Sequence, residues 1–305
     1  MFILNPDPYY LPCYRIGPFR TEDLSRNNGF VNSDLFDDYL RERFGDKRLC
    51  YTYNGRQAID IALSYYDLRR DDVITILTTT GNYYISSCVT SVIERYCRWS
   101  RELNEHTKVI FVNHEFGYPL TGISQLRELG LPIIEDCASS FFSFDQNRHI
   151  GEIGDFVIYS FPKMFPLQFG GLLVSNKYPL GQSSLIDTSK LKYLKNVLSN
   201  YIQQKEDLIA ARIRNYIFLA ECFRNMGFSE RFELQQGVVP GVFMFKTEGH
   251  DVNLPELKKH FWAHGIQCSV FYGEDAFFIP AHQALDEQDM LYFRDVMLSF
   301  LNLRI

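Results

Sequence analysis

Short apolar runs alternate with amphipathic stretches through the first 180 residues. Four runs are continuous rather than alternating, which is typical of strands buried on both faces of a sheet, namely 73–77, 108–112, 131–134 and 156–159. Helical spacing of apolar positions precedes or separates these runs, in the ranges 34–44, 54–66, 82–99 and 122–130. The alternation predicts a mostly parallel sheet with right-handed crossovers, and ligands of such sheets lie outside the carboxyl ends of the strands.

Two helix starts carry recognisable capping residues. Ser33 is expected to cap the helix that stops at Phe44-Gly45, and Asn54 to cap the next one. Gly55 follows at that second start, so backbone N–H groups stay open toward the positive end of the helix dipole, which suits a phosphate. An ordinary Asn-Gly cap explains the same residues about as well.

The pattern changes after residue 176. Residues 181–225 are polar and helix-forming and predict a long helix that links two domains. A strand–helix–strand unit follows at 242–271, with Asn253 opening its helix, and Asp286 is expected to cap a last helix. We therefore predict a large α/β domain with a mostly parallel sheet at 1–180, with an extended proline-containing arm at 1–30, and a smaller α+β domain at 181–305.

Composition narrows the classes of function. A net charge of −6 and the absence of a basic stripe argue against a nucleic-acid surface, so a small-molecule partner is expected. Seven scattered cysteines without a CxxC pair indicate neither a disulfide framework nor a zinc site, and they fit a reducing cytoplasm. No apolar stretch reaches membrane-spanning length, and the first residues lack the basic region of a signal peptide.

One lysine lies in an unusual sequence context. Lys163 occupies the stretch 160–171 between two apolar runs, together with two prolines and a Gly-Gly pair that lets the backbone pass close to something bulky. A lysine in a dry, crowded place loses solvation as a cation, which favours the neutral amine that attacks a carbonyl. The pattern is that of a Schiff-base lysine, whereas a lysine that snorkels to the surface is the ordinary alternative.

Other chemistries lack their motifs. Glu135-Asp136 after an apolar strand is not accompanied by a GxxxxGK[ST] phosphate loop, and no GxGxxG or GxSxG sequence occurs. His260 and His264 lie four residues apart on a predicted helix without the glutamate of a zinc protease, so we expect two surface histidines and no metal site.

The remaining features fit pyridoxal phosphate (PLP). They are a phosphate-type helix start, an aromatic pair at Tyr83-Tyr84, the carboxylate of Asp136 and the amine of Lys163. PLP needs an anion site, a flat group against its ring, an acid that keeps its pyridine nitrogen protonated, and an amine for its aldehyde. A helix cap or a loop hydrogen bond is the ordinary alternative for Asp136.

Four segments carry a resemblance to the DegT/StrS-type family of sugar-nucleotide aminotransferases, which are PLP enzymes of fold type I. The chain is similar to that family over the helix start, the acidic strand end, the lysine turn and a closing turn, in the ranges 54–59, 135–139, 154–171 and 279–286. The resemblance runs from about residue 33 to the end and is most specific at 131–175.

The resemblance assigns roles to particular residues. It implies that Lys163 is the imine lysine and that Asp136 holds the pyridine nitrogen. It places Ser160, with Asn54, Gly55 and Arg56 of the helix start, at the cofactor phosphate, Ser139 at the ring hydroxyl, and Tyr84 or Tyr83 against the ring. It also implies transamination of a keto-sugar nucleotide in amino-sugar biosynthesis, glutamate as amino donor, and a homodimer.

Departures from the family pattern keep two alternatives open. Arg56 and Ser139 replace a small hydroxyl residue and a Gln or His, Lys163 follows Ser160 by three residues instead of five, and residues 181–225 lack a Gly-Tyr-Asn-x-Arg segment. One alternative is a non-catalytic family member that acts as a binding or partner subunit. The other is a PLP enzyme with a different reaction on deoxysugars, although the family's dehydratases carry histidine in place of the lysine.

Overall fold

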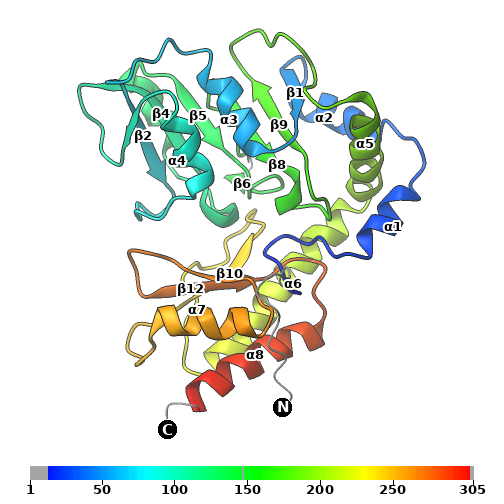
Figure 1. Ribbon diagram of the computed structural model, residues 1–305, viewed down its shortest axis with the longest axis vertical. Coiled ribbons are helices and arrows are strands. Elements are labelled where there is room, and N and C mark those ends of the chain that lie inside the picture. The colour runs from blue at the N-terminus through cyan, green and yellow to red at the C-terminus, as the bar shows by residue number, and fades with distance from the viewer. Residues whose placement is uncertain (1–12, 146–147, 303–305) are drawn as a thin grey trace.

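The computed structural model describes residues 13–145 and 148–302, which form two α/β domains stacked one above the other (Figure 1). The predicted fold class is confirmed: a large, mostly parallel sheet with helices on its faces and a smaller domain at the C-terminal end. The first twelve residues of the predicted arm lie outside the described part of the chain.

The helices and strands have the following bounds. The α-helices are α1 (Asp23–Asn28), α2 (Leu35–Phe44), α3 (Gly55–Leu63), α4 (Ser87–Ile93), α5 (Thr188–Ile202), α6 (Lys205–Arg224), α7 (Leu254–Ala263) and α8 (Glu287–Asn302). The 3-10 helices are η1 (Glu115–Gly117), η2 (Ile123–Leu129) and η3 (Phe161–Lys163). The strands are β1 (Arg48–Thr52), β2 (Val73–Thr78), β3 (Arg98–Ser100), β4 (Thr107–Asn113), β5 (Ile133–Asp136), β6 (Phe144–Asp145), β7 (Arg148–His149), β8 (Phe156–Ser160), β9 (Gly171–Ser175), β10 (Val242–Lys246), β11 (Ser269–Val270) and β12 (Ala276–Pro280).

The large sheet has the strand order β1-β9-β8-β5-β4-β2-β3. Strand β9 runs antiparallel to both of its neighbours, and the other described pairs in this sheet are parallel. Strands β1, β4, β5 and β8 therefore run in the same direction and end at the same edge of the sheet. Because ligands of open α/β sheets bind at the carboxyl ends of the strands, this edge is where a site is expected.

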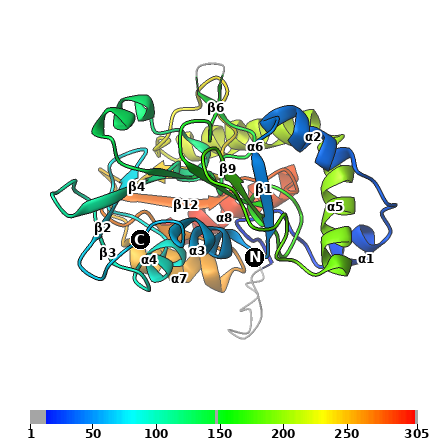
Figure 2. The ribbon, with the colours of Figure 1, turned by 90° about the horizontal axis from the view of Figure 1, so that it is seen from above.

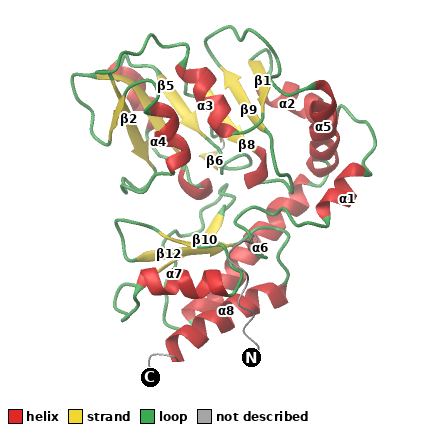
Figure 3. Cartoon of the chain, viewed as in Figure 1, coloured by secondary structure: helices red, strands yellow, loops and turns green. Residues whose placement is uncertain are grey.

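The small domain is a three-stranded antiparallel sheet, β10-β12-β11, with helices on one side (Figure 3). The predicted caps at Asn253 and Asp286 are confirmed, since their side chains accept hydrogen bonds from Glu256 N–H and Asp289 N–H at 3.1 and 2.9 Å. Strand β12 was not foreseen, and the strand expected to end at residue 271 is only the two-residue β11.

The segment that follows the boundary predicted at residue 180 packs on the large domain before it reaches the small one. Residues 181–225 form two helices rather than one, and α5 gathers with α1 and α2 beside β1 at the edge of the large sheet (Figure 2). The apolar core of the large domain includes Leu194 and Leu208, whereas that of the small domain begins at Tyr216. The division between the cores therefore falls within α6, which passes from one domain to the other (Figure 1).

The N-terminal arm also belongs partly to the small domain. Tyr14 N–H donates to the Gly265 carbonyl at 2.9 Å, and Gln267 N–H donates to the Tyr14 carbonyl at 2.8 Å. Farther along, residues 23–28 form the short helix α1 instead of extended chain. The chain thus starts against one domain and crosses to the other before α2.

Local predictions of the helices were partly right. Asn54 caps α3 by accepting from Gln57 N–H at 3.0 Å, and Gly45 ends α2 with a φ of 58°, as expected. Asp34 occupies the N-cap position of α2 without a side-chain hydrogen bond, and Ser33, one residue earlier, accepts one from Leu35 N–H at 3.4 Å. The helix expected at 82–99 is shorter, because Ser86 caps α4 at its start and residues 98–100 pair with β2 as the edge strand β3.

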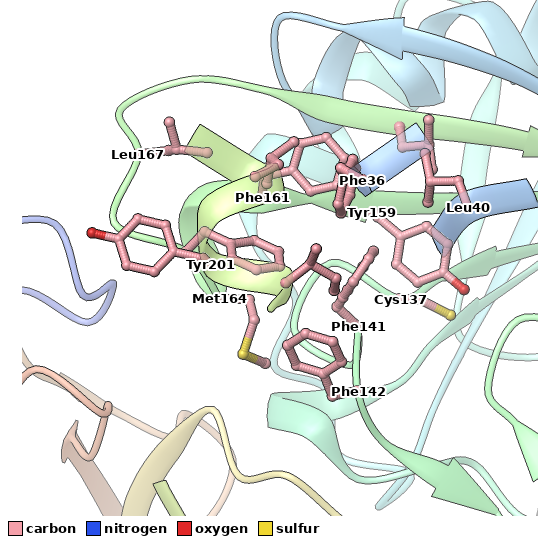
Figure 4. Packing of buried hydrophobic residues seen from close by; sticks show 14 of the residues in the cluster. Phe36, Leu40, Cys137, Phe141, Phe142, Tyr159, Phe161, Met164, Leu167 and Tyr201 are labelled. Carbon is pink, nitrogen blue, oxygen red and sulfur yellow. The ribbon is translucent and has the colours of Figure 1, made fainter. Parts of the chain in front are cut away.

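Aromatic side chains anchor the turn that carries Lys163 (Figure 4). Phe161 packs edge-on against Phe36 with ring centroids 5.4 Å apart, and Phe165 packs edge-on against Phe141 at 5.5 Å. Both phenylalanines of the turn are buried. Because edge-to-face pairs add about 1 kcal/mol each to the burial of apolar area, the turn is held firmly while its lysine stays outside the cluster.

The Gly-Gly pair has the role that the sequence indicated. Gly170 has a φ of +114°, and a Cβ there would lie 2.8 Å from a methyl group of Leu194. A Cβ on Gly171 would lie 2.7 Å from Thr52 Oγ1 and 2.9 Å from the Asn54 carbonyl carbon. The pair therefore allows β9 to approach the start of α3 closely.

No described helix is long and apolar enough to cross a lipid bilayer. All seven cysteines are free thiols, and four of them are buried.

Candidate active site

A pocket of about 560 Å³ opens where the two domains face one another. Its large-domain side is lined by the carboxyl ends of β4, β5 and β8, the start of α3 and the turn η3. Its small-domain side includes Lys258 and Trp262 of α7 and Ser269 of β11. The pocket also contains every sequence-predicted site residue except Tyr83: Asn54, Gly55, Arg56, Tyr84, Asp136, Ser139, Ser160 and Lys163.

Asp136 ends β5 on the floor of this pocket and is 5% exposed. Its carboxylate accepts hydrogen bonds from the Asn113 side-chain amide at 2.9 Å and from Ala138 N–H at 3.0 Å. Burial raises the pKa of Asp136 despite these two donors. Within the described residues no Lys, Arg or His forms an ion pair with it, so the carboxylate can still accept a cationic partner.

Glu135, one residue earlier, points to the other side of the sheet. Its oxygens accept hydrogen bonds from Gly151, Ile153 and Gly154 N–H groups and from His114 Nε2, the last at 3.0 Å. Burial acts to raise the pKa of Glu135, but His114 and these N–H donors outweigh it and hold the pKa below its usual range. Leu120 N–H donates to His114 Nδ1 at 3.1 Å, so the proton of the neutral imidazole is on Nε2 and points at Glu135.

The Glu135 contacts also explain why three side chains that could ligate a metal ion lie close together. His114, Glu135 and Cys137 place ligand atoms within 4.8 Å of one another. Glu135 already accepts four N–H donors there, and burial raises the pKa of the Cys137 thiol well above its usual range. The cluster is therefore accounted for as part of the domain core.

Lys163 ends η3 and projects at the pocket from the anchored turn. Among the described residues its Nζ has no hydrogen bond or ion pair. The expectation of a dry, crowded lysine is wrong for the chain alone, because Lys163 is exposed. The buried members of the turn include both phenylalanines, Met164 and Leu167, which belong to the apolar core of the large domain. The amine is thus accessible and uncommitted.

The start of α3 and the end of β8, which leads into the lysine turn, meet in the same corner of the pocket. A Cβ on Gly55 would be in ordinary contact, at 3.7 Å, with Ile158 Cγ2 and with the Cβ of Ser160. Ser160 is partly buried, and Arg56 is exposed on the first turn of α3. A serine hydroxyl, a guanidinium and the positive end of a helix therefore line one part of the pocket, which is a donor set suited to an anion.

The two candidate aromatic residues differ in position. Tyr84 lines the pocket and packs against small-domain aromatics, including Phe271 with ring centroids 5.4 Å apart. Tyr83 is 67% exposed and lies against the Arg101 guanidinium outside the pocket lining. Ser139 follows β5 and lines the pocket near Asp136.

Sequence reasoning missed three polar residues around these groups. Asn113 ends β4 and donates to Asp136, and its place after an apolar strand was a usable signal. His114 follows it and fixes Glu135. Arg212 of α6 is fully buried and donates to the Lys163 carbonyl at 2.7 Å. The sequence does contain a sign of this role: Arg212 lies four residues after Leu208, which places a charged residue on the buried face of the helix.

The histidine pair on α7 is not at the surface, in contrast to the expectation. His264 is buried and its Nδ1 lies 2.7 Å from the His260 carbonyl oxygen. His260 is half-buried, and its Nε2 lies 3.0 Å from Ser299 Oγ on α8. The pair belongs to the packing of α7 on α8, and neither residue lines the pocket.

Comparison with known proteins gives a consistent picture. A family model described as "Putative PLP-dependent aminotransferase" matches residues 37–205. The chain is also 28% identical over 177 residues to GDP-perosamine synthase of Vibrio cholerae, an alignment that covers 49% of this chain and 47% of that protein. The chain thus spans about half the length of the curated relatives it matches.

Solved structures share the fold over a longer range. The aminotransferase TlmJ of Streptoalloteichus hindustanus superposes with a TM-score of 0.73 at 15% identity, covering 92% of this chain and 95% of that one. A DegT DnrJ EryC1 StrS aminotransferase of Brucella abortus superposes with a TM-score of 0.67 at 16% identity, covering 92% and 93%. At such identities the superpositions establish the two-domain fold.

Proposed function

The chain belongs to the family of PLP-dependent aminotransferases, and from this premise we propose that it transfers an amino group to a keto-sugar nucleotide in amino-sugar biosynthesis, with glutamate as donor. The observation that carries the proposal is the convergence of Asn54, Asp136, Ser160 and Lys163 in one pocket, although they come from separate strands and turns. The relative in Vibrio cholerae, named for a GDP-sugar product, supports the substrate class.

The residues present fit the cofactor of this family. Asp136 is a buried carboxylate with a raised pKa and no ion pair among the described residues, so a protonated pyridine nitrogen would complete its surroundings. Ser160, Gly55 and Arg56 would hold the phosphate, and Tyr84 and Ser139 would contact the ring and its hydroxyl. When bound, PLP supplies an aldehyde and a ring that accepts electrons from the substrate carbon.

The chain's own groups divide the remaining work. Lys163 would supply an amine at the pocket for the aldehyde, and its Nζ would hold and move the proton at the donor carbon. Asp136 would hold the protonated pyridine nitrogen, and Asn113 fixes the carboxylate by its hydrogen bond at 2.9 Å. Lys258 and Trp262 on the opposite wall would contact the substrate.

The proposal extends to assembly and location. A homodimer follows from the family resemblance, in which the active site is shared between subunits. A cytoplasmic location is supported by the seven free thiols, since disulfides are rare in reducing compartments.

Visible absorption spectroscopy tests this function. Purified wild-type protein incubated with PLP should show a band that is absent from Lys163→Ala and is bleached by glutamate. Amino transfer from glutamate to a panel of keto-sugar nucleotides, followed by mass spectrometry of the products, would then identify the acceptor. A Lys163→Ala variant with wild-type band and turnover would refute the assignment, and a wild type without a band would favour a non-catalytic member.

A further inference from the structure

Arg212 of α6 is a fully buried cation whose side chain contacts the lysine turn. The residue is 0% exposed, and no carboxylate among the described residues forms an ion pair with it. Burial lowers the pKa of Arg212 to about 9, so the side chain is still a cation at pH 7. A buried guanidinium without a counterion is costly to fold, and an apolar side chain would avoid this cost.

The guanidinium of Arg212 donates hydrogen bonds to three segments that meet at the domain junction. Its Nη2 donates to the Lys163 carbonyl at 2.7 Å, its Nη1 to the Pro240 carbonyl at 3.2 Å and its Nε to Gln283 Oε1 at 2.7 Å. A planar guanidinium with donors in a fixed fork can hold three acceptors at fixed relative positions, which a lysine cannot do.

Gln283 extends this contact to the next peptide of the turn. Its Nε2 donates to the Met164 carbonyl at 2.7 Å while its Oε1 accepts from Arg212. Two successive carbonyls, those of Lys163 and Met164, are therefore held by groups from α6 and from the turn before α8. Asn27 Nδ2 holds a third carbonyl of the same turn, that of Pro166, at 2.8 Å.

We infer that Arg212 is a positioning residue that orients the Lys163 peptide so that the lysine amine points at the reactive carbonyl in the pocket. The lysine side chain has four rotatable bonds, and its amine makes no hydrogen bond or ion pair among the described residues, so the direction of its first bond depends on the peptide. This inference rests on the proposed role of Lys163. A misplacement of about 1 Å can cost a reacting pair about a hundredfold in rate.

The test measures capture of an aldehyde by Lys163 separately from binding in the pocket. The amine of Lys163 condenses with the aldehyde of PLP and releases one water, and the rate constant of the resulting visible band is measured by stopped flow. Pyridoxamine phosphate carries an amine instead of the aldehyde, so its affinity, measured by calorimetry, reports the pocket without the lysine reaction.

We expect Arg212→Met to lower the rate constant of band formation by about tenfold or more, while the affinity for pyridoxamine phosphate stays within about twofold of wild type. The rate constant of Arg212→Lys should lie between those of Arg212→Met and wild type, because lysine keeps the charge but not the forked donor geometry. Gln283→Ala removes only the neighbouring contact and should lower the rate constant by about threefold. If Arg212→Met does not fold, Gln283→Ala provides the test.

A matched control is Arg43→Met. Arg43 is a partly buried arginine that also donates to a backbone carbonyl, that of Phe141, at 2.6 Å, and its side-chain hydrogen bonds go to residues outside the lysine turn. This variant should lower the melting temperature and leave the rate constant unchanged. A wild-type rate constant in Arg212→Met would overturn the inference, as would equal losses of rate and of pyridoxamine phosphate affinity. Persistence of the band in Lys163→Ala would instead refute the proposed function.

Discussion

Two neighbouring carboxylates at the end of β5 lie in opposite surroundings. Glu135 faces the domain core and accepts four N–H donors, three of them from residues 151–154, and its pKa is held low. Asp136 faces the pocket with two donors, and burial raises its pKa. One strand end thus carries a carboxylate that is already fully hydrogen-bonded beside one that is free to receive a cation, which supports the functional role proposed for Asp136.

Asp136→Asn should produce the largest effect on function. Removing the charge that holds a protonated nitrogen should lower the rate of transamination by about 10²–10³-fold, the usual scale for loss of an electrostatic contact at a reacting group. Steady-state kinetics with glutamate checks this. A loss smaller than about threefold would mean that Asp136 is no more functional than its neighbour.

Glu135→Gln should act on stability instead. The variant leaves N–H donors facing an amide NH₂ in the core and should lower the free energy of unfolding by about 3 kcal/mol. Urea unfolding measures this change. Activity per folded molecule should stay within about threefold of wild type, and a selective loss of activity without loss of stability would contradict the division of roles.

Asn113→Ala sharpens the comparison on the pocket side. This change removes one of the two donors to Asp136 and should lower kcat/KM by about tenfold, since a hydrogen bond to a charged group contributes about 1.5–3 kcal/mol. The cofactor titration of the same variant should show weaker binding. Unaltered kinetics would mean that the Asn113 hydrogen bond to Asp136 does not contribute to activity.

Acid titration should show the smallest effect. The folded pKa of Glu135 is lowered, so its stabilisation is present above the unfolded pKa of about 4.3 and is lost as the pH falls through the lower folded pKa. The difference in unfolding free energy between wild type and Glu135→Gln should therefore be constant from pH 7 to about 5 and shrink below pH 4. A difference that grows on acidification would be inconsistent with a lowered pKa.

Local patterns predicted the parts of the site that lie on regular elements. Continuous apolar runs identified the strands that end at Asp136 and Ser160, and the Gly-Gly pair identified the close approach beside the lysine turn. These features depend on neighbouring residues, and short-range sterics and burial are sufficient to predict them.

The remaining features depend on contacts between distant segments. The exposure of Lys163 follows from the direction in which the phenylalanines of its turn pack, and the Arg212 contact joins residues 49 positions apart. The packing of α5 on α2 was likewise not predictable, because α5 is polar along much of its length. Periodicity gives the buried face of a helix and does not give the partner that covers it.

Thermal unfolding of the cofactor-free protein at pH 7 tests the central comparison most directly, with wild type, Asp136→Asn and Glu135→Gln side by side. Because the folded pKa of Asp136 is raised, its charge destabilises the fold at pH 7, and a neutral amide should raise the melting temperature. Glu135→Gln should lower it. Opposite shifts would support one structural and one functional carboxylate at the end of β5, and shifts of the same sign would contradict that account.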